Sequence, residues 1–332
     1  MSTALQKNNE SRFSVAIQKD EYQKLIRDTL AEPRVRQRFI ANITTVVANT
    51  PALQDANPGS IISGALLAES LGLSMAPMLG YCYLVPFTEA VKGADGKKIY
   101  LLDQNGNHIL DENKRWKFKT EKKAQFIMGY TGFIQLAIRS GVYKKISAFA
   151  VKEGEIKKKL DPMTEDMVIS FIDDEDERDA APTCGYVAWF ETKDGYRKVM
   201  YMSHKKMVKH ADKYSPAFSA SAYEKIQSGD MPQKEMWKYS SPWYTDFDMM
   251  GCKTMLRRLL KKWGPTSTTD TKLSDAIMND NCVGKDDGSF SPIRLDDVPK
   301  TPLPIQDDPD VSDIPDISEE YADDEEIDFD EL

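Results

Sequence analysis

The stretch MGYTGFIQLAIRSGVYKKI (residues 128–146) carries the signals that decide the fold. It extends a strand-like segment, AQFIMGY (124–130), and its glycines mark a turn out of that strand. The next residues have a helical period, with an apolar face opposite a polar one: Phe133, Ile134, Ala137 and Ile138 against Gln135 and Arg139. Gly141 is a natural helix stop, and residues 144–155 return to a strand pattern. The stretch predicts strand, helix and strand, and it lacks the G-x-x-x-x-G-K-[ST] of a nucleotide-binding loop.

Helical periodicity also covers residues 21–73, where Ser60 is the predicted N-cap of a helix that stops at Gly72. GYCYLVPF (80–87) predicts a buried strand that ends at Pro86.

Two hairpins are predicted, one turning at Asn105-Gly106 and one at residues 193–195. Ser203 is the predicted cap of a lysine-rich helix, and a long helix is predicted over 245–263, ended by Gly264-Pro265. No internal repeat is apparent.

The 332 residues predict a single core domain over 26–270, a flexible N-terminus over 1–25 and a disordered acidic tail over 271–332. The formal net charge of -9 divides unevenly along the chain. From Val283 onward there are 18 Asp and Glu against three Lys and Arg, a net of -15, which leaves a net of +6 for residues 1–282. A basic body with an acidic tail suggests that the body binds a polyanion such as nucleic acid.

Several protein classes are not expected. No run of 18 apolar residues and no signal peptide is present, which predicts a cytoplasmic protein without a membrane span. The four cysteines lie far apart and the three histidines complete no zinc pattern, so we expect reduced thiols, no metal site and no cofactor.

The helix over 245–263 carries the most informative charge pattern. Lys253, Arg257 and Lys261 recur every four residues, with Arg258 and Lys262 beside them. Such like charges repel on an isolated helix. Cations near a helix C-terminus can simply offset the macrodipole, which accounts for Lys261 but not for Lys253. The pattern is therefore either a solvated face or an anion-binding face.

Two further stretches interleave cations with aromatic rings. RSGVYKK offers Arg139, Lys144 and Lys145 around Tyr143, and KRWKFKTEKK (114–123) repeats the composition. This combination suits single-stranded nucleic acid, because cations follow the backbone and rings stack on bases. Solvated lysines beside an aromatic at the edge of the core are the alternative.

A weaker pattern suggests a nuclease. FETK contains Glu191-x-Lys193, with acidic DDEDERD (173–179) upstream, and a metal-dependent nuclease would need such carboxylates on Mg²⁺ with a lysine near the attacking water. However, Lys193 also begins the predicted hairpin turn. No G-x-S-x-G, Walker loop or H-E-x-x-H is present.

Three blocks in order, LLAESLGLSMAPMLGYCYLVPF (66–87), the segment 124–155, and SPWYTDFDMMGCKTMLRRLLKKW (241–263), resemble the RecT family of phage and prophage single-strand annealing proteins. The resemblance covers residues 30–265, and it implies a mixed α+β fold in which a small antiparallel sheet with a β-hairpin packs on helices. It implies ATP-independent annealing of DNA strands in homologous recombination, on a basic groove of a ring or helical filament. It also implies single-stranded DNA and the nascent duplex as ligands, a RecE-like exonuclease partner, a host single-stranded DNA-binding protein as a further partner, and a bacterial cytoplasm. A general single-stranded DNA- or RNA-binding chaperone is the alternative, with Mg²⁺ as a modulator of binding in either case.

On this resemblance the predicted DNA-binding residues are cations that contact phosphates and rings that stack on bases: Arg139, Lys144, Lys145, Lys253, Arg257, Arg258 and Lys261, with Tyr130 and Tyr143. Three features depart from the family. Cys252-Lys253 stands where two lysines are common, residues 88–121 are longer than usual, and the acidic tail is long. The tail is expected either to compete with DNA for the body or only to keep filaments soluble, and its tip EIDFDEL resembles the tails of bacterial single-stranded DNA-binding proteins.

Overall fold

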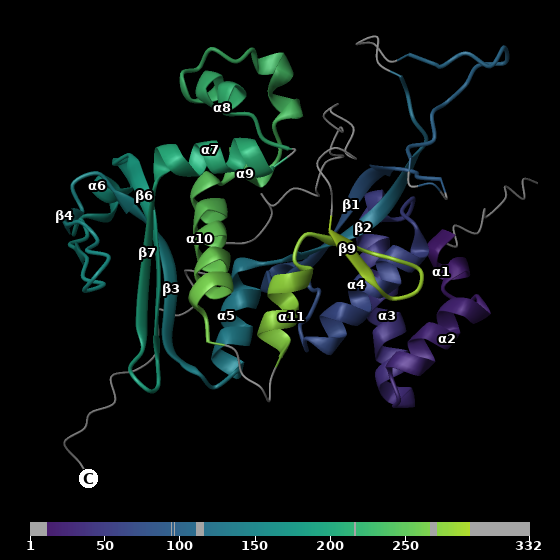
Figure 1. Cartoon of the computed structure of the whole chain (residues 1–332), viewed down its shortest axis with the longest axis horizontal. Coiled ribbons are helices and arrows are strands. Elements are labelled where there is room, and N and C mark those ends of the chain that lie inside the picture. The colour runs from purple at the N-terminus through teal and green to yellow at the C-terminus, as the bar shows by residue number, and fades with distance from the viewer. Residues whose placement is uncertain are drawn as a thin grey trace, which may run out of the picture.

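The computed structural model describes residues 12–292 except 94, 96, 111–115, 216 and 266–270. It is an α+β protein with small antiparallel sheets, as predicted. Figure 1 shows two groups of elements, one around the sheet that contains β1 and β2 and one around the sheet of β3, β6 and β7, with α5, α10 and α11 between them. One continuous hydrophobic core runs through both groups. None of the described helices is long and apolar enough to cross a membrane.

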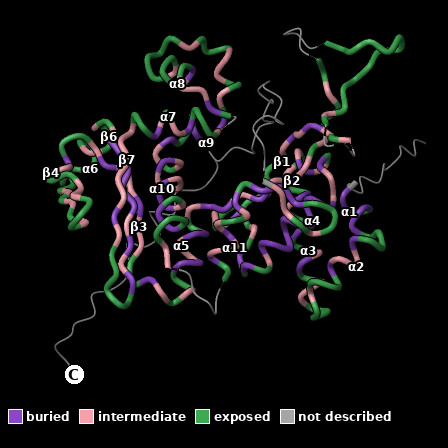
Figure 2. The backbone as a smooth tube through the Cα atoms, in the orientation of Figure 1, coloured by how far each residue is buried: buried purple, intermediate pink, exposed green. Residues whose placement is uncertain are grey.

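The first group packs helices on a four-stranded antiparallel sheet with the order β1-β2-β8-β9. Its elements are α1 (Arg12–Ala16), α2 (Asp20–Thr29), α3 (Pro33–Asn49), η1 (Pro51–Leu53), α4 (Pro58–Ser70), η2 (Pro77–Leu79), β1 (Cys82–Ala90), β2 (Thr120–Met128), β8 (Cys282–Gly284) and β9 (Phe290–Pro292). Helix α4 is apolar on all sides and is buried from Gly59 to Ala68, because helices cover one side of it and β2 and β8 the other. Figure 2 shows this buried centre.

The second group is built on the antiparallel sheet β3-β6-β7, whose two strand pairs match the predicted hairpin and return strand. Its elements are α5 (Tyr130–Arg139), β3 (Tyr143–Lys152), β4 (Ile156–Lys158), β5 (Val168–Ile169), α6 (Glu175–Ala180), β6 (Thr183–Thr192), β7 (Arg197–Ser203), α7 (His204–Tyr214), α8 (Ala220–Gln227), η3 (Gln233–Lys238), α9 (Pro242–Thr245), α10 (Phe247–Trp263) and α11 (Lys272–Asn279). Helix α10 packs on all three strands of this sheet.

The stretch over 128–146 leads from β2 through α5 into β3, as predicted. Its glycines are required by a close crossing of the backbone. A Cβ at Gly129 would lie 1.8 Å from the carbonyl oxygen of Gly80, and one at Gly132 would lie 2.0 Å from that of Tyr81. Gly141 follows the end of α5 with a φ of 72°, so the predicted helix stop is confirmed. The glycines therefore let the start of β1 cross the start of α5.

The predicted boundary of the tail is wrong by more than one element. Residues 272–292 form α11, β8 and β9, and β8 pairs with β2 at Gln125 and Phe126. Fading apolar periodicity hid a short helix whose Leu273 and Ala276 are buried, and acidic composition hid strand residues that complete a sheet. The prediction of disorder for residues 293–332 lies outside the described residues.

The predicted flexible N-terminus also needs correction. From Arg12 the chain is helical, and Phe13, Ile17 and Tyr22 are buried, so apolar contacts hold residues 12–25 on the core. Residues 1–11 lie outside the described part.

Two local predictions in this group were wrong. Asn57 caps α4 by accepting a hydrogen bond from Ser60 N (3.2 Å). Ser60 Oγ instead accepts a hydrogen bond from Ala124 N (2.8 Å) and so joins α4 to β2. Strand β1 continues through Pro86 to Ala90, because β1 is an edge strand where a missing N–H is tolerated.

The Asp280 carboxylate joins the two groups. It is buried after α11, and its Oδ1 accepts a hydrogen bond from Met128 N at the end of β2 (2.8 Å). Its Oδ2 lies 2.8 Å from Nε of Arg257 on α10 in an ion pair, and Nη2 of Arg257 donates a hydrogen bond to the Asp280 carbonyl oxygen (3.3 Å). The Nε contact is not aligned as a hydrogen bond, so its strength is that of a close charge pair. One side chain therefore holds β2, α10 and α11 together.

We expect Asp280→Ala to lower the free energy of unfolding by about 3 kcal/mol, because it leaves a half-buried arginine and a buried N–H without their acceptor. Urea unfolding followed by circular dichroism measures the change. The control is Asp173→Ala, which removes an exposed carboxylate and should stay within about 0.5 kcal/mol of the parent. Equal midpoints for the two variants would contradict a joint at Asp280.

Candidate nucleic-acid interface

Helix α10 is a rigid base for a row of cations. Asp246 caps it by accepting a hydrogen bond from Met249 N (3.0 Å). Its buried side chains, which include Met255, Leu256 and Leu259, hold it on the core. The helix ends at Trp263, directly before Gly264-Pro265, as predicted. Side chains on its other faces are thereby fixed relative to both sheets.

The predicted ladder of cations is divided by its surroundings. Arg257 is bound to Asp280, so its charge is already paired within the protein, and its predicted contact with a phosphate stays a prediction. Lys261 and Arg258 are exposed, and no described carboxylate forms an ion pair with either of them. The helical period predicted a single cationic face, but one residue of that face, Arg257, is paired with the buried Asp280.

Lys253 lies one turn before Arg257 and is half-buried. Desolvation lowers the pKa of its ammonium, an effect that Asp280 opposes and Arg257 reinforces. A charged amine that has lost much of its water gains more from an incoming anion than an exposed one does. An anion that reaches Lys253 would therefore stabilise its charged form.

A second source of cations is α7, whose buried residues Met207 and Ala211 turn the opposite face outward. Lys209 and Lys213 are exposed there, four residues apart, and the half-buried His210 lies between them. The pKa of His210 is lowered by burial and then by the positive charges of Arg258, Arg257 and Lys213. We refer to Lys209, His210, Lys213 and Arg258 as the His210 cluster.

The cations of the His210 cluster form no ion pair with a described carboxylate. Asp212, the acidic residue inside α7, instead accepts a hydrogen bond from Ala220 N (2.8 Å). Close cations without counter-charges raise one another's free energy, and a polyanion relieves this cost. The cluster was missed from the sequence. The lysine-rich composition of α7 was visible, but its position beside α10 was not.

Three of the predicted cations lie around the connection from α5 to β3. Arg139, Lys144 and Lys145 are exposed. Nη1 of Arg139 donates a hydrogen bond to the carbonyl oxygen of Gly72 (2.8 Å), and Nζ of Lys144 lies 2.6 Å from Glu191. All three side chains remain at the surface, and Arg139 and Lys144 already have partners within the protein.

The two predicted stacking rings are held by the protein. Tyr143 is only 5% exposed, its ring meets Phe190 edge to face, and its hydroxyl donates to the Pro265 carbonyl oxygen (3.4 Å). Its ring is thus covered by the protein in this structure, and its role as a stacking ring stays a prediction. Tyr130 is half-buried and its hydroxyl donates to the carbonyl oxygen of Ala148 (2.9 Å), so its role stays a prediction.

Glu191, the carboxylate of the nuclease-like pattern, is occupied by cations. Its pKa is lowered by the hydrogen bond from Lys144 and by the charges of Lys145 and Arg197. Lys193 lies in the turn, where its backbone N donates to the Val142 carbonyl oxygen (3.0 Å). Among the described residues, no group of three His, Cys, Asp or Glu side chains could hold a metal ion.

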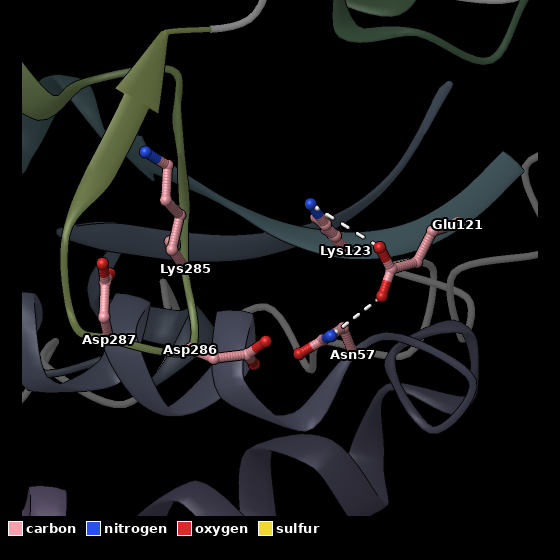
Figure 3. A pocket seen from close by; sticks show the side chains of 7 residues that line it. Asn57, Glu121, Lys123, Lys285, Asp286 and Asp287 are labelled. Atoms are coloured by element: carbon pink, nitrogen blue, oxygen red, sulfur yellow. Dashed lines mark hydrogen bonds and ion pairs between the residues drawn. The ribbon is translucent and has the colours of Figure 1, made fainter. Parts of the chain in front are cut away.

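The pocket in Figure 3 differs in charge from the His210 cluster. It lies between the start of α4, β2 and the β8–β9 turn, and Asn57, Lys123, Lys285, Asp286 and Asp287 are among its lining residues. Glu121 accepts a hydrogen bond from Nδ2 of Asn57 (2.8 Å) and lies 3.6 Å from Nζ of Lys123. Its lining carries three carboxylates against two lysines, so it attracts an anion much less than the His210 cluster does.

Comparison with known proteins gives one family. A model of the RecT family matches residues 37–289. The uncharacterized protein YqaK of Bacillus subtilis (strain 168) is 30% identical over 227 residues, which are 68% of this chain and 59% of that protein. Protein RecT of Escherichia coli (strain K12) is 27% identical over 225 residues, 68% of this chain and 65% of that protein. The chain thus spans less than two thirds of the length of these relatives.

We expect Arg258→Ala to raise the pKa of His210, because Arg258 is the first of the cations that lower it. Histidine ring signals followed by NMR across a pH titration measure the pKa. Lys225→Ala, on the exposed side of α8, removes a positive charge that has no part in this shift and should leave the titration unchanged. A His210 pKa that is the same in both variants would place Arg258 away from the ring.

Proposed function

The chain belongs to the RecT family, and from this premise we propose that it binds single-stranded DNA and anneals complementary strands in homologous recombination. The observation that carries the proposal is the His210 cluster. Arg258 of α10 and Lys213 of α7, distant in sequence, both lower the pKa of the half-buried His210, and neither forms an ion pair with a described carboxylate. A phosphate backbone supplies the missing negative charge.

The chemistry of the cations supports a backbone contact. Exposed Arg258, Lys209 and Lys213 can each release a condensed counterion when they meet a phosphate. Lys253 is desolvated and so favours an anion further. None of these groups reads a base edge by itself, because contacts to phosphates carry no sequence information. The base edges stay free to pair with a second strand.

Annealing on such a surface needs no ATP in our proposal. Stacked base pairs contribute about 1.4 kcal/mol per step, so pairing itself drives the reaction once the strands are aligned. The protein's task is to offset phosphate repulsion and to hold each strand extended. In the proposal, the cations fixed on α7 and α10 perform both tasks.

Further expectations come with the family premise and belong to the proposal. They are an oligomeric ring or helical filament, a RecE-like exonuclease and a host single-stranded DNA-binding protein as partners, a phage or prophage origin, action in the bacterial cytoplasm, and Mg²⁺ as a modulator of DNA binding. In a filament, the His210 clusters of successive subunits would form one continuous positive track.

We expect the protein to accelerate pairing of complementary oligonucleotides without ATP, and Arg258→Ala to anneal more slowly. If Arg258 makes one phosphate contact, its variant should also lower the slope of log affinity against log salt by about 0.7. A fluorescence-quenching annealing assay and binding isotherms at several salt concentrations give both values.

Lys225→Ala is the matched control for charge and should change neither value. Tight binding without faster pairing would favour a general single-strand chaperone over an annealing protein. An unchanged slope for Arg258→Ala would exclude the His210 cluster as the contact surface.

We also expect DNA to raise the pKa of His210, because phosphates stabilise the protonated ring that the neighbouring cations now disfavour. By linkage, DNA binding should tighten as the pH falls toward that pKa. NMR titration with and without an oligonucleotide gives the shift. His204 is the internal control, since it lies at a hydrogen bond with Tyr186 (2.9 Å) outside the cluster. Equal shifts at both histidines would point to a change of fold rather than to a local contact.

A further inference from the structure

The segment between β1 and β2 forms an arm that leaves the body of the protein (Figure 1). We call its described residues between 91 and 119 the aromatic arm. Figure 2 shows it as the most continuously exposed part of the fold. Leu102, Leu110 and Trp116 are 54%, 50% and 55% exposed. Large apolar side chains on a projecting element usually mark an interaction site.

The arm has an internal repeat that the sequence analysis missed. Tyr100, His108 and Trp116 are spaced eight residues apart, and Leu102, Leu110 and Phe118 follow at the same spacing. Three backbone hydrogen bonds close the repeats into a ring: Leu101 N to Lys117 O (2.9 Å), Lys117 N to Ile109 O (2.7 Å) and Ile109 N to Leu101 O (3.0 Å). The arm is therefore a built module rather than an irregular loop.

The three aromatic rings of the repeat meet on one side. His108 stacks on Trp116 with 4.3 Å between ring centroids, and Tyr100 meets both edge to face at 5.5 and 5.6 Å. Because the rings use their faces on one another and Leu102 and Leu110 lie beside them, the cluster is poorly suited to stack unpaired bases. It is suited to cover apolar side chains of a polypeptide. Lys97, Lys117 and Lys119 are exposed around it, so the polypeptide should be acidic.

The chain itself contains a segment of this chemistry. Residues 323–332, DDEEIDFDEL, place Ile327, Phe329 and Leu332 among seven acidic residues. The chain beyond β9 ends there, and β9 belongs to the same sheet as β1 and β2, which carry the arm. The 40 residues after Pro292 can span at most about 130 Å, enough to reach the arm of the same subunit or of a neighbour.

We propose that the aromatic arm is the docking site of this acidic C-terminal segment, residues 323–332. The apolar side chains of the segment cover the Tyr100–His108–Trp116 cluster, and its carboxylates pair with Lys117 and Lys119. Tethering gives the segment a high local concentration, so weak intrinsic affinity suffices. Docking on the arm holds the polyanion away from the His210 cluster. The proposal does not depend on DNA binding or annealing.

The test is zero-length carbodiimide cross-linking of the full-length protein without DNA, read by mass spectrometry. We expect amide links between Lys117 or Lys119 and the carboxylates of residues 323–331. The triple variant Tyr100→Ala, His108→Ala, Trp116→Ala keeps every lysine and should form about tenfold fewer of these links, because it removes the ring contacts. Tyr214→Ala with Trp237→Ala, which removes two exposed rings outside the arm, is the matched control and should cross-link like the parent.

A second variant keeps the arm intact. Ile327→Ala, Phe329→Ala, Leu332→Ala retains all charges of the segment and should lose the same links. Unchanged links in both variants would mean attraction by charge alone and would overturn the proposal. Links to Lys209 and Lys213 in place of the arm would also overturn it, since the segment would then occupy the His210 cluster. Mixing ¹⁴N- and ¹⁵N-labelled protein shows whether the docked segment comes from the same chain or a neighbour, and either result agrees with the proposal.

Discussion

The buried carboxylate of Asp280 is the constraint on which the arrangement of this protein depends. It accepts a hydrogen bond from Met128 N at the end of β2 and pairs with Arg257 on α10. Its neighbour Asn281 donates its backbone N–H to the Phe126 carbonyl oxygen (2.9 Å). A buried charge is tolerated only with such partners, so the three elements must come together in one geometry. The sheet of β1 and β2 and the sheet of β3, β6 and β7 are thereby fixed to the same helix.

This joint also decides which cations remain for function. Arg257 is used inside the protein, while Arg258, the next residue, is exposed beside His210. A single helix thus divides its positive charge between a structural pair and an open surface. Since α7 adds Lys209 and Lys213 to that surface, the basic face is built from two rigid helices. Fixed cations lose little side-chain freedom on meeting a polyanion, compared with cations on a loop.

The aromatic arm has a different relation to the body. Its repeats satisfy their own backbone groups in a ring, and its apolar side chains add nothing to the core. An element of this kind contributes to function through the molecule that it binds. Its sheet also contains β9, the last described strand before the acidic segment, and opposite charge gives the arm and the segment a reason to meet.

The sequence by itself determined the local elements and the family. Apolar periodicity gave the α5 and α10 helices, alternation and turn residues gave the β6–β7 hairpin, and three ordered blocks indicated the RecT family. These signals are local, because a residue's period and its turn chemistry do not depend on distant partners. Only the tertiary structure decided which charged and aromatic residues are available. It buried Tyr143, bound Arg257 to Asp280, moved residues 272–292 from the tail into the core, and brought Lys213 of α7 near Arg258 of α10. Each of these outcomes is a contact between residues far apart in the chain, and whether a charge is paired or a ring covered is a property of that contact rather than of the residue type.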